Sequence, residues 1–392
     1  MIIRIAIPNY HCYASCMIER KSYLSALETA VSRSPVTALL GPRQCGKTTL
    51  ARIFGEQRNA HYFDLESIAD QRRLQNPEMM LSTLRGLIVL DEIQLQPELF
   101  SVLRVLVDQR GFEGRFLVLG SASPHIIRNV SETLAGRVEF IELSGFDLRE
   151  IGSEHSESLW VRGGFPRSWL AASEEDSLAW REGFIRTFLE RDIPALGIHI
   201  APTAMRRFWT MLAHYHGQTW NASELARSMG VSDKTVRSYL DILTATFMVR
   251  QLQPWHENLR KRQVKAPRIY FRDSGILHAL LNIPDYHVLT GHPRLGASWE
   301  GFALEQVAQA LHPDETYFWS THGGAEVDLL IFDQGKRIGV EFKFSEAPKI
   351  TRSMHTAVED LSLDQLWVVY PGKEAYPVTK EITVRPLIDV VC

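Results

Sequence analysis

A glycine-rich turn that leads from an apolar run into Lys-Thr-Thr constrains this chain more than any other feature of its sequence. Residues 36–48 read VTALLGPRQCGKT, and Thr49 follows. The spacing is G-x-x-x-x-G-K-[ST], in the strand–loop–helix setting that this phosphate-binding motif requires. Glycines let backbone N–H groups face a phosphate chain, and the N-terminus of the following helix adds a partial positive charge. The segment therefore predicts a nucleoside triphosphate site.

The loop residues divide the expected work between them. Lys47 is expected to bridge the β- and γ-phosphates of ATP, and the Thr48 hydroxyl to bind Mg²⁺. Cys45 reads as a small residue that faces the helix, or as a thiol that the helix N-terminus makes reactive when nucleotide is absent. The predicted nucleotide-binding residues are Gly41, Pro42, Arg43, Gln44, Cys45, Gly46, Lys47, Thr48 and Thr49.

A second apolar run ends in two acids about fifty residues after the loop. Residues 86–94 read GLIVLDEIQ, which is typical of a buried strand followed by a Walker B pair. Asp91 is expected to hold the Mg²⁺ shell, and Glu92 to orient and deprotonate the attacking water.

The spacing of apolar runs predicts a parallel sheet with crossover helices. The five expected strands are VTALLG, AHYFDLE, GLIVLDE, RFLVLGS and RVEFIEL. Ser121 ends the fourth strand, where its hydroxyl could sense the γ-phosphate. Arg137 begins the fifth expected strand and reads either as an arginine finger, acting in trans within a ring of identical subunits, or as a surface salt-bridge residue.

The middle of the chain is predicted to be helical. Residues 151–200 are expected to form a lid with a long helix that stops at Pro194. Residues 221–255 then show the spacing of a helix-turn-helix, with Gly230 in the turn, followed by a strand that resembles a wing. Such a module contacts DNA or only packs beside an ATPase core, and both readings stay open.

Cations gather in and after this module. Lys234, Thr235 and Arg237 lie near the start of its second helix, where contacts to bases or phosphates would arise. Residues 250–272 carry seven cations against Glu257 alone, which indicates either a phosphate-binding surface or a solvated face. The predicted contacts in this stretch are Arg260, Lys261 and Arg262. Asp273 is expected to cap the next helix.

Near the C-terminus, residues 324–344 read GAEVDLLIFDQGKRIGVEFKF and predict a β-hairpin. Strand alternation would place Val327, Leu329 and Ile331 on one face and Asp328 on the other. Glu341 and Lys343 share the polar side of the partner strand, so that carboxylates cluster where burial is costly without a cation.

A divalent metal would offset that cost. Asp328 and Glu341 are expected to hold Mg²⁺, with Glu305 from an upstream helix as a further ligand. Lys343 would position the nucleophilic water near a phosphodiester. The alternative is a solvated hairpin with a salt bridge.

Composition sets the remaining bounds. A chain of 392 residues predicts two to three domains at about 150 residues each. The net charge of -3 argues against a uniformly basic nucleic-acid binder and leaves room for local basic patches. No apolar run approaches the roughly 18 residues of a membrane span, so a cytoplasmic protein without membrane contact is expected.

Its cysteines and its N-terminus carry weaker signals. Cys12, Cys16, Cys45 and Cys392 form no pair of C-x-x-C motifs, which fits a reducing compartment; Cys12 and Cys16 as metal ligands are the disfavoured alternative. Polar residues interrupt the first apolar run and argue against a signal peptide. An amphipathic helix starts at Met17, so residues 1–16 are expected to be an extension.

The order of these motifs, together with GGFP at 163–166 and YFRDSGI at 270–276, resembles the family of AAA ATPases with a DUF4143 domain. The resemblance covers about residues 17–390. It implies a five-stranded parallel P-loop core with a helical lid, a winged helix and a restriction-endonuclease-like α/β domain of the PD-(D/E)xK type. Val327-Asp328 replaces the Pro-Asp of that signature. The expected boundaries are 1–16, 17–150, 151–200, 201–275 and 276–392.

The function expected from these features is a Mg²⁺-dependent ATPase coupled to binding or processing of DNA. One alternative is a signalling or scaffold ATPase whose nuclease-like domain binds protein. Another is a DNA motor, for example in branch migration, which would need a ring.

Overall fold

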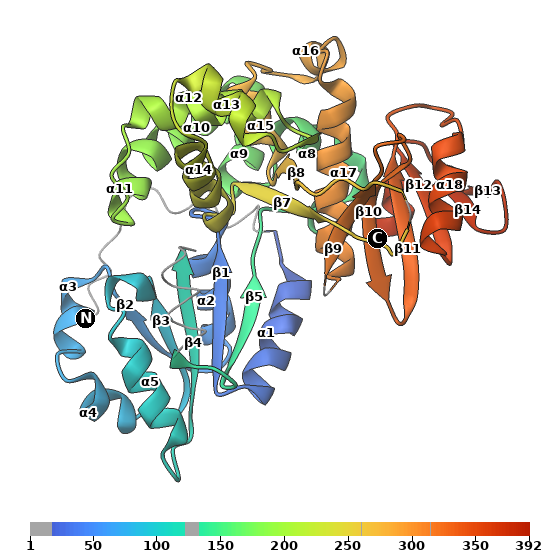
Figure 1. Cartoon of the computed structure of the whole chain (residues 1–392). Coiled ribbons are helices and arrows are strands. Elements are labelled where there is room, and N and C mark those ends of the chain that lie inside the picture. The colour runs from blue at the N-terminus through green and yellow to red at the C-terminus, as the bar shows by residue number, and fades with distance from the viewer. Residues whose placement is uncertain (1–17, 122–132, 260, 314) are drawn as a thin grey trace.

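The computed structural model describes residues 18–121, 133–259, 261–313 and 315–392. The expected N-terminal extension with its two cysteines, and Arg260, lie outside this part of the chain. In Figure 1 the N-terminal sheet lies below a helical middle segment, and the C-terminal strands lie to one side.

The N-terminal sheet confirms the predicted five-stranded parallel core. Its strand order is β2-β3-β4-β1-β5, with β1 paired in parallel to both β4 and β5. Apolar residues on its two faces form separate clusters beneath the covering helices. The strands are β1 (Val36–Gly41), β2 (His61–Asp64), β3 (Gly86–Asp91), β4 (Gly114–Ser121) and β5 (Val138–Glu142). The helices are α1 (Lys21–Arg33), α2 (Lys47–Glu56), α3 (Ile68–Arg73), α4 (Pro77–Ser82), the 3₁₀ turn η1 (Ile93–Leu95) and α5 (Leu99–Asp108).

The segment that follows is helical, as expected, and its long helix ends close to Pro194. The helical run passes from α10 through one π-helical stretch into α11, and it ends at Ala195, one residue after Pro194. A proline removes a backbone donor and disfavours continuation of a helix, which fits this end point. The elements are α7 (Leu148–Ile151), η2 (Ser153–His155), α8 (Ser156–Arg162), α9 (Pro166–Trp169), α10 (Glu174–Thr187), η3 (Phe188–Asp192) and α11 (Ile193–Ala195).

Residues 202–271 form a compact group of helices with a small antiparallel sheet. The helices are α12 (Pro202–His214), α13 (Ala222–Met229) and α14 (Asp233–Ala245). Gly230 takes the left-handed conformation in the turn after α13, where a β-carbon is disfavoured. The strands are β6 (Gln218–Thr219), β7 (Val249–Pro254) and β8 (Arg268–Phe271), with β8 paired to both others.

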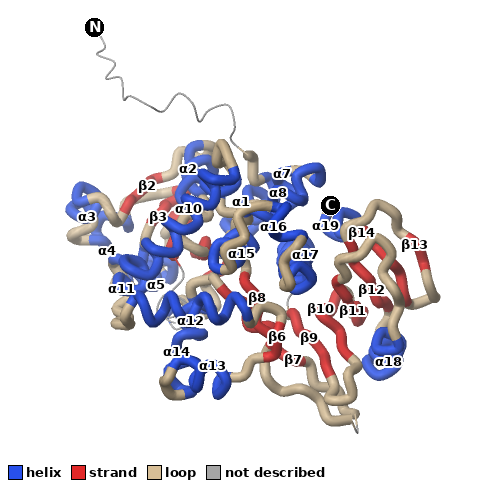
Figure 2. The backbone as a smooth tube through the Cα atoms, turned by 90° about the horizontal axis from the view of Figure 1, so that it is seen from above, coloured by secondary structure: helices blue, strands red, loops and turns tan. Residues whose placement is uncertain are grey.

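The C-terminal region continues that sheet to nine strands, because β7 also pairs in parallel with β9. Figure 2 shows helix α17 on one side of these strands and α18 on the other, and the two helices pack in separate apolar clusters. The strands are β9 (Thr316–Ser320), β10 (Glu326–Asp333), β11 (Lys336–Phe342), β12 (Gln365–Tyr370), β13 (Tyr376–Pro377) and β14 (Ile382–Pro386). The helices are α15 (Ser274–Leu280), α16 (Tyr286–Thr290), α17 (Leu295–Leu311), α18 (Arg352–Leu361) and α19 (Leu387–Val391).

The predicted hairpin is β10 and β11, paired from Leu329↔Val340 to Asp333↔Lys336. The expectation that Val327 shares a face with Leu329 is wrong. The register of β10 on β9 shifts between Val327 and Leu330, which breaks the alternation of a regular strand. Val327 therefore packs in the same cluster as Leu330, whereas Leu329 packs in the other cluster.

The part of the chain that the structure describes contains no helix that is both long enough and apolar enough to cross a membrane.

Candidate active site

The phosphate loop lies at the carboxyl end of β1 and is shaped by its backbone. Gln44 and Gly46 both have positive φ, 63° and 102°, which turns successive peptide groups within the loop. Gly41 cannot carry a side chain, because a β-carbon there would lie 2.1 Å from the carbonyl oxygen of Leu143. Gly41 is thus required by the close approach of Leu143, and Gly46 by its positive φ.

Lys47 is buried and begins α2. Its Nζ donates hydrogen bonds to the carbonyl oxygens of Gly41 and Pro42, at 3.0 and 2.8 Å. Both acceptors are backbone carbonyls of the phosphate loop, so neither of these two hydrogen bonds is made to a carboxylate. A phosphate oxygen that enters the loop would be a stronger acceptor than either carbonyl.

Thr48, in the first turn of α2, contacts Asp91, the last residue of β3. The Thr48 Oγ1 donates to Asp91 Oδ2 at 2.9 Å, and Asp91 is buried. The same carboxylate oxygen accepts a hydrogen bond from the Tyr62 hydroxyl at 2.5 Å. Oxygen ligands of this kind suit Mg²⁺, so the residues fit the metal that a bound triphosphate brings. Tyr62 was not singled out from sequence.

Glu92 has an unusual backbone. Its φ and ψ are 57° and 46°, the left-handed region that a residue with a β-carbon rarely adopts. Holding such a residue there costs on the order of 1–3 kcal/mol, which is typical of functional sites. Its carboxylate accepts a hydrogen bond from Gln94. The strained turn carries Glu92 past the end of β3, beside Asp91.

Ser121 and Arg137 lie at opposite ends of the strands: Ser121 at the carboxyl ends and Arg137 at the amino ends. Ser121 pairs with Gly41 at the carboxyl edge, although its side chain lies outside the described part. Arg137 precedes Val138, which pairs with the first residue of β1, about 16 Å of strand away from the loop. Its guanidinium forms an exposed ion pair with Asp108, at 2.7 and 2.9 Å. The exposed ion pair agrees with the surface salt-bridge reading, and an arginine finger acting in trans stays a prediction.

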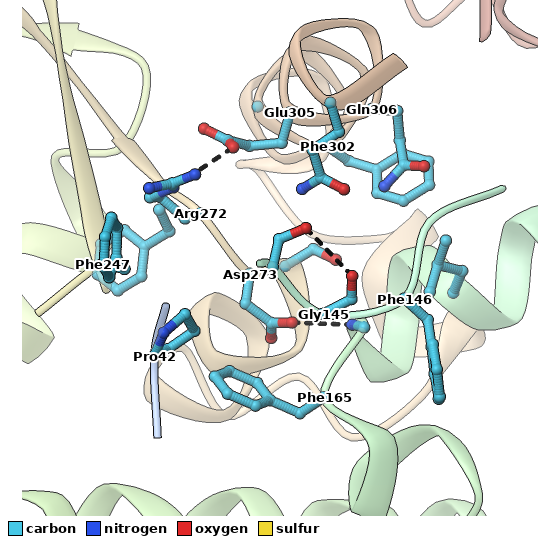
Figure 3. Close-up of a pocket in the computed structure, with 17 residues that line it drawn as sticks. Pro42, Gly145, Phe146, Phe165, Phe247, Arg272, Asp273, Phe302, Glu305 and Gln306 are labelled. Atoms are coloured by element: carbon cyan, nitrogen blue, oxygen red, sulfur yellow. Dashed lines mark hydrogen bonds and ion pairs between the residues drawn. The ribbon is translucent and has the colours of Figure 1, made fainter. Parts of the chain in front are cut away.

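The middle segment contacts the loop directly. Arg43 forms ion pairs with Asp192 on η3 and, at 3.8 Å, with Glu66. The turn after α14 also reaches this place: Thr246 lines one cavity with Arg43, and Phe247 lines a second cavity with Pro42. Figure 3 shows the second cavity, where the phosphate loop, the turn after α14 and helix α17 converge.

Pro166 approaches the loop from another direction. Its ring lies 4.0 Å from the position that a β-carbon on Gly46 would take. The same GGFP segment is also joined to the chain after β5, because the Phe146 N–H donates a hydrogen bond to the carbonyl oxygen of Gly164 at 2.7 Å. The GGFP segment is thus placed beside the nucleotide site by backbone hydrogen bonds.

Glu305 does not join the predicted metal site. It is buried on α17, where Arg250 donates to its carboxylate at 2.5 and 2.9 Å. Arg272 lies 3.6 Å from the same carboxylate and also pairs with Glu142 at the end of β5. Glu305 therefore helps to join the core sheet, the small sheet and α17, and its expected role as an Mg²⁺ ligand is wrong.

Asp328, Glu341 and Lys343 are brought together, as predicted. Lys343 Nζ lies 2.8 Å from Glu341 Oε2 and 3.9 Å from Asp328 Oδ2. Arg268 of β8 donates to Asp328 at 3.0 Å and also pairs with Glu326. Two side-chain cations therefore supply the offset that had been ascribed to a metal. Among the described residues, no cluster of three or more His, Cys, Asp or Glu could hold a metal ion.

Glu300 is the carboxylate that α17 contributes to this charged centre. The Tyr270 hydroxyl donates to it at 2.5 Å. Burial, together with the charge of Asp328, raises the pKa of Glu300 to about 8. Burial and Asp328 also raise the pKa of Glu341 well above its usual range. Glu300, five residues before Glu305 on the same helix, was not singled out from the sequence.

Most of the basic stretch serves internal contacts. The cations of 250–272 with ion pairs inside the chain are Arg250, Lys261, Arg268 and Arg272. Lys261, a predicted nucleic-acid contact, pairs with Asp360 of α18 at 2.6 Å. Arg262 and Lys265 are exposed. The local excess of positive charge is thus largely compensated by acids distant in sequence.

Two of the three predicted contact residues at the start of α14 are exposed to solvent. Lys234 and Arg237 are exposed on this helix. Thr235 is half-buried, and its N–H and hydroxyl both contact the Ser232 hydroxyl, which caps the helix. Asp273 caps α15 as expected, since its Oδ1 accepts the Ile276 N–H at 2.8 Å.

Cys45 is fully buried, and its thiol donates to the carbonyl oxygen of Leu143. The reading of a small residue in the loop fits this position. A thiol that is open to alkylating reagents in the folded loop does not.

Comparison with known families divides the chain into three consecutive parts. A model of the AAA domain matches residues 33–152. Two models described as domains of unknown function follow, DUF8612 over residues 153–287 and DUF4143 over residues 295–389.

Close relatives span nearly the whole chain. The Mycobacterium tuberculosis protein Rv2008c and the Mycobacterium bovis protein Mb2031c are each 51% identical over 378 residues, which is 96% of this chain and 86% of the relative. Solved structures are more distant. The Walker-type ATPase PABY2304 of Pyrococcus abyssi has a TM-score of 0.48 at 14% identity, covering 68% of this chain and 97% of that one. DnaA of Aquifex aeolicus bound to AMPPCP has a TM-score of 0.30 at 16% identity, covering 57% and 87%. From the family models and the close relatives, the chain belongs to the family of AAA-type P-loop ATPases that carry a C-terminal DUF4143 domain.

Proposed function

We propose that this ATPase requires Mg²⁺ and uses its nucleotide state to control how residues 202–271 engage nucleic acid. The observation that carries the proposal is that the phosphate loop and the turn after α14 line the same two cavities. Pro42 and Arg43 of the loop line the two cavities that Phe247 and Thr246 also line. A change in the conformation of the loop would therefore alter two cavities that the end of α14 also lines.

Each residue of the nucleotide site has a distinct task in this proposal. Lys47 exchanges its two carbonyl acceptors for phosphate oxygens, a stronger charge-assisted contact. Thr48 and Asp91 would hold Mg²⁺, which supplies neutralisation of phosphate charge when bound. Glu92 orients the attacking water and accepts its proton, from a backbone position beyond the end of β3.

Arg43 links the same loop to the middle segment. Its guanidinium pairs with Asp192, which is buried in η3, and also lies near Glu66. A triphosphate brings negative charge beside this guanidinium. Arg43 would then be drawn from Asp192 toward the phosphates, and the buried carboxylate would keep only Arg191 of its two cationic partners, which is unfavourable. The nucleotide state would in this way shift the position of η3.

The nucleic-acid side of the proposal rests on α12 to β8. Their order is helix, short strand, two helices joined by a tight turn, and two antiparallel strands, which is the order of a winged helix. Lys234 and Arg237 are exposed near the start of the second helix of the pair, and Arg262 and Lys265 are exposed between the two strands. These cations, and not the whole basic stretch, are the proposed phosphate contacts.

The test measures binding of fluorescently labelled duplex, single-stranded and branched DNA, with ATP analogue, with ADP and without nucleotide. We expect affinity to depend on the nucleotide and to fall with salt. Asp192→Ala should remove the nucleotide dependence. Glu190→Ala, an exposed change in the same π-helical turn, is the matched control. Affinity that is indifferent to nucleotide in the unaltered protein would refute the coupling.

ATP turnover is tested separately. Glu92→Gln should abolish hydrolysis while nucleotide binding persists. A variant that hydrolyses ATP at the normal rate would remove Glu92 from the mechanism. Stimulation of turnover by one form of DNA would identify the preferred partner.

A second candidate, a scaffold ATPase whose C-terminal domain binds protein, is favoured by the charged centre. Arg268 and Lys343 already pair with Asp328 and Glu341 there. Plasmid nicking with Mg²⁺ or Mn²⁺ distinguishes the two candidates, since Asp328→Ala should abolish it if the domain is a nuclease. Failure to cleave any DNA form with either metal favours the scaffold.

A ring remains a further proposal, in which Arg137 acts on a neighbouring subunit. Its exposed position at the edge opposite the loop suits an action in trans, provided that the pair with Asp108 opens. The mass of the assembly with and without ATP tests whether such a ring forms, as a motor on DNA would require.

A further inference from the structure

Tyr62 occupies a place that connects two strands of the core to the metal-binding carboxylate. Strand β2 runs beside β3, so that Tyr62 pairs with Val89 and Asp64 with Asp91. Although Tyr62 is thus not level with Asp91 in the register, its hydroxyl reaches Asp91 Oδ2 at 2.5 Å. The side chain therefore extends along the strands toward their carboxyl ends, where the phosphate loop lies.

The Asp91 carboxylate is held from three directions. Oδ2 accepts from Tyr62 at 2.5 Å and from Thr48 at 2.9 Å. Oδ1 accepts from the N–H of Glu92 at 3.0 Å. With Asp91 only 3% exposed, few other groups can orient it. Of these donors, Tyr62 is the one that belongs neither to the phosphate loop helix nor to the Walker B turn.

The ring of Tyr62 also lies beside a cation. The Arg52 guanidinium lies over the ring, 5.4 Å from its centroid. Tyr62 thus contacts Arg52 through its ring and Asp91 through its hydroxyl.

We propose that Tyr62 is a positioning residue for the metal of the nucleotide site: it sets the orientation of Asp91 from which the Mg²⁺ shell is bound. The proposal rests on the proposed function. Thr48 donates to Asp91 and is itself an expected ligand of the metal. Tyr62 donates to the same carboxylate and is not an expected ligand, so it is the side chain whose role there is confined to orienting Asp91. Outer-shell partners of this kind typically change metal affinity by about 10–100-fold when removed.

The experiment compares Tyr62→Phe with the unaltered full chain. Affinity for a fluorescent non-hydrolysable ATP analogue is measured in EDTA and across a Mg²⁺ titration. We expect the affinity in EDTA to be unchanged and the half-saturating Mg²⁺ concentration to rise about tenfold, at the low end of that range, because Thr48 and the Glu92 amide still hold Asp91. Mn²⁺ binding in the presence of the analogue, followed by electron paramagnetic resonance, should weaken in parallel.

Tyr23→Phe is the matched control. Tyr23 is buried in the same core, and its hydroxyl bonds to Ser144 at 3.2 Å, so the change removes an equivalent group from another place. An equal loss of affinity in EDTA and in Mg²⁺, or a Mg²⁺ requirement that matches the Tyr23→Phe protein, would overturn the role of Tyr62. If the unaltered chain binds no nucleotide with Mg²⁺, the proposed function itself fails and the inference falls with it.

Discussion

The charged centre of the C-terminal region allows a stability prediction that follows directly from its contacts. Arg268 has a side chain that is 10% exposed and donates to Asp328, whose side chain is 4% exposed, at 3.0 Å. Its second partner, Glu326, is 43% exposed and adds little, because water screens that pair. Arg268→Met keeps most of the side-chain volume but leaves Asp328 without this cation. Breaking a buried pair on one side costs about 3–5 kcal/mol.

Hydrogen exchange measured by mass spectrometry on peptides from β10 and β11 reports this loss locally, and urea unfolding reports it globally. The expected cost corresponds to exchange that is at least about a hundredfold faster in β10, since about 1.4 kcal/mol is a factor of ten. Arg262→Met removes an exposed arginine from the same connection and should leave exchange unchanged.

Adding Asp328→Asn to Arg268→Met should recover more than half of the loss, because a neutral amide needs no counter-charge and its oxygen can still accept the Phe342 N–H. The reasoning fails if Arg268→Met lies within about 1 kcal/mol of the unaltered protein, or if the double variant is no more stable than the single one.

Three further predictions concern the same molecule. The pKa of Glu300 is raised from 4.5 to about 8 in the folded protein, so between these pH values the folded protein holds a proton that the unfolded chain releases. The free energy of unfolding should therefore fall as pH rises from 4.5 to about 8. In a series of urea unfolding curves, Glu300→Gln should make this decline smaller. Arg137→Ala should leave ATP turnover unchanged at concentrations where light scattering finds a monomer, whereas a loss there would contradict the exposed pairing with Asp108. Cys392 is exposed and Cys45 is buried, so brief treatment with a maleimide should label Cys392 first, with or without nucleotide; rapid labelling of Cys45 in peptide mass spectra would show that the loop opens.

Local patterns were sufficient for the core sheet and the nucleotide loop. The phosphate loop needs positive φ at Gln44 and Gly46, and these demands fall within a few consecutive residues. The same holds for the hairpin of β10 and β11, whose turn carries positive φ at Gln334 and Gly335. Features of this kind are encoded by neighbours in the sequence, so spacing alone predicts them.

Contacts between distant segments were not predictable in the same way. Tyr62 reaches Asp91 across a strand pair, and Arg268 reaches Asp328 from a strand 60 residues earlier. The choice between Glu300 and Glu305 depends on which face of α17 meets the cations of β7 and β8. A pattern of charges shows that compensation is needed, whereas only the packed structure shows which residue provides it.

Strand β7 has a mechanical consequence. It shares backbone hydrogen bonds with β8 on one side, and on the other its Gln253 and Pro254 pair with Tyr317 and Phe318 of β9. A hinge between the two regions would have to separate β7 from β9. A displacement of α14 that began at the phosphate loop would therefore reach the DUF4143 domain through the β7–β9 pairing.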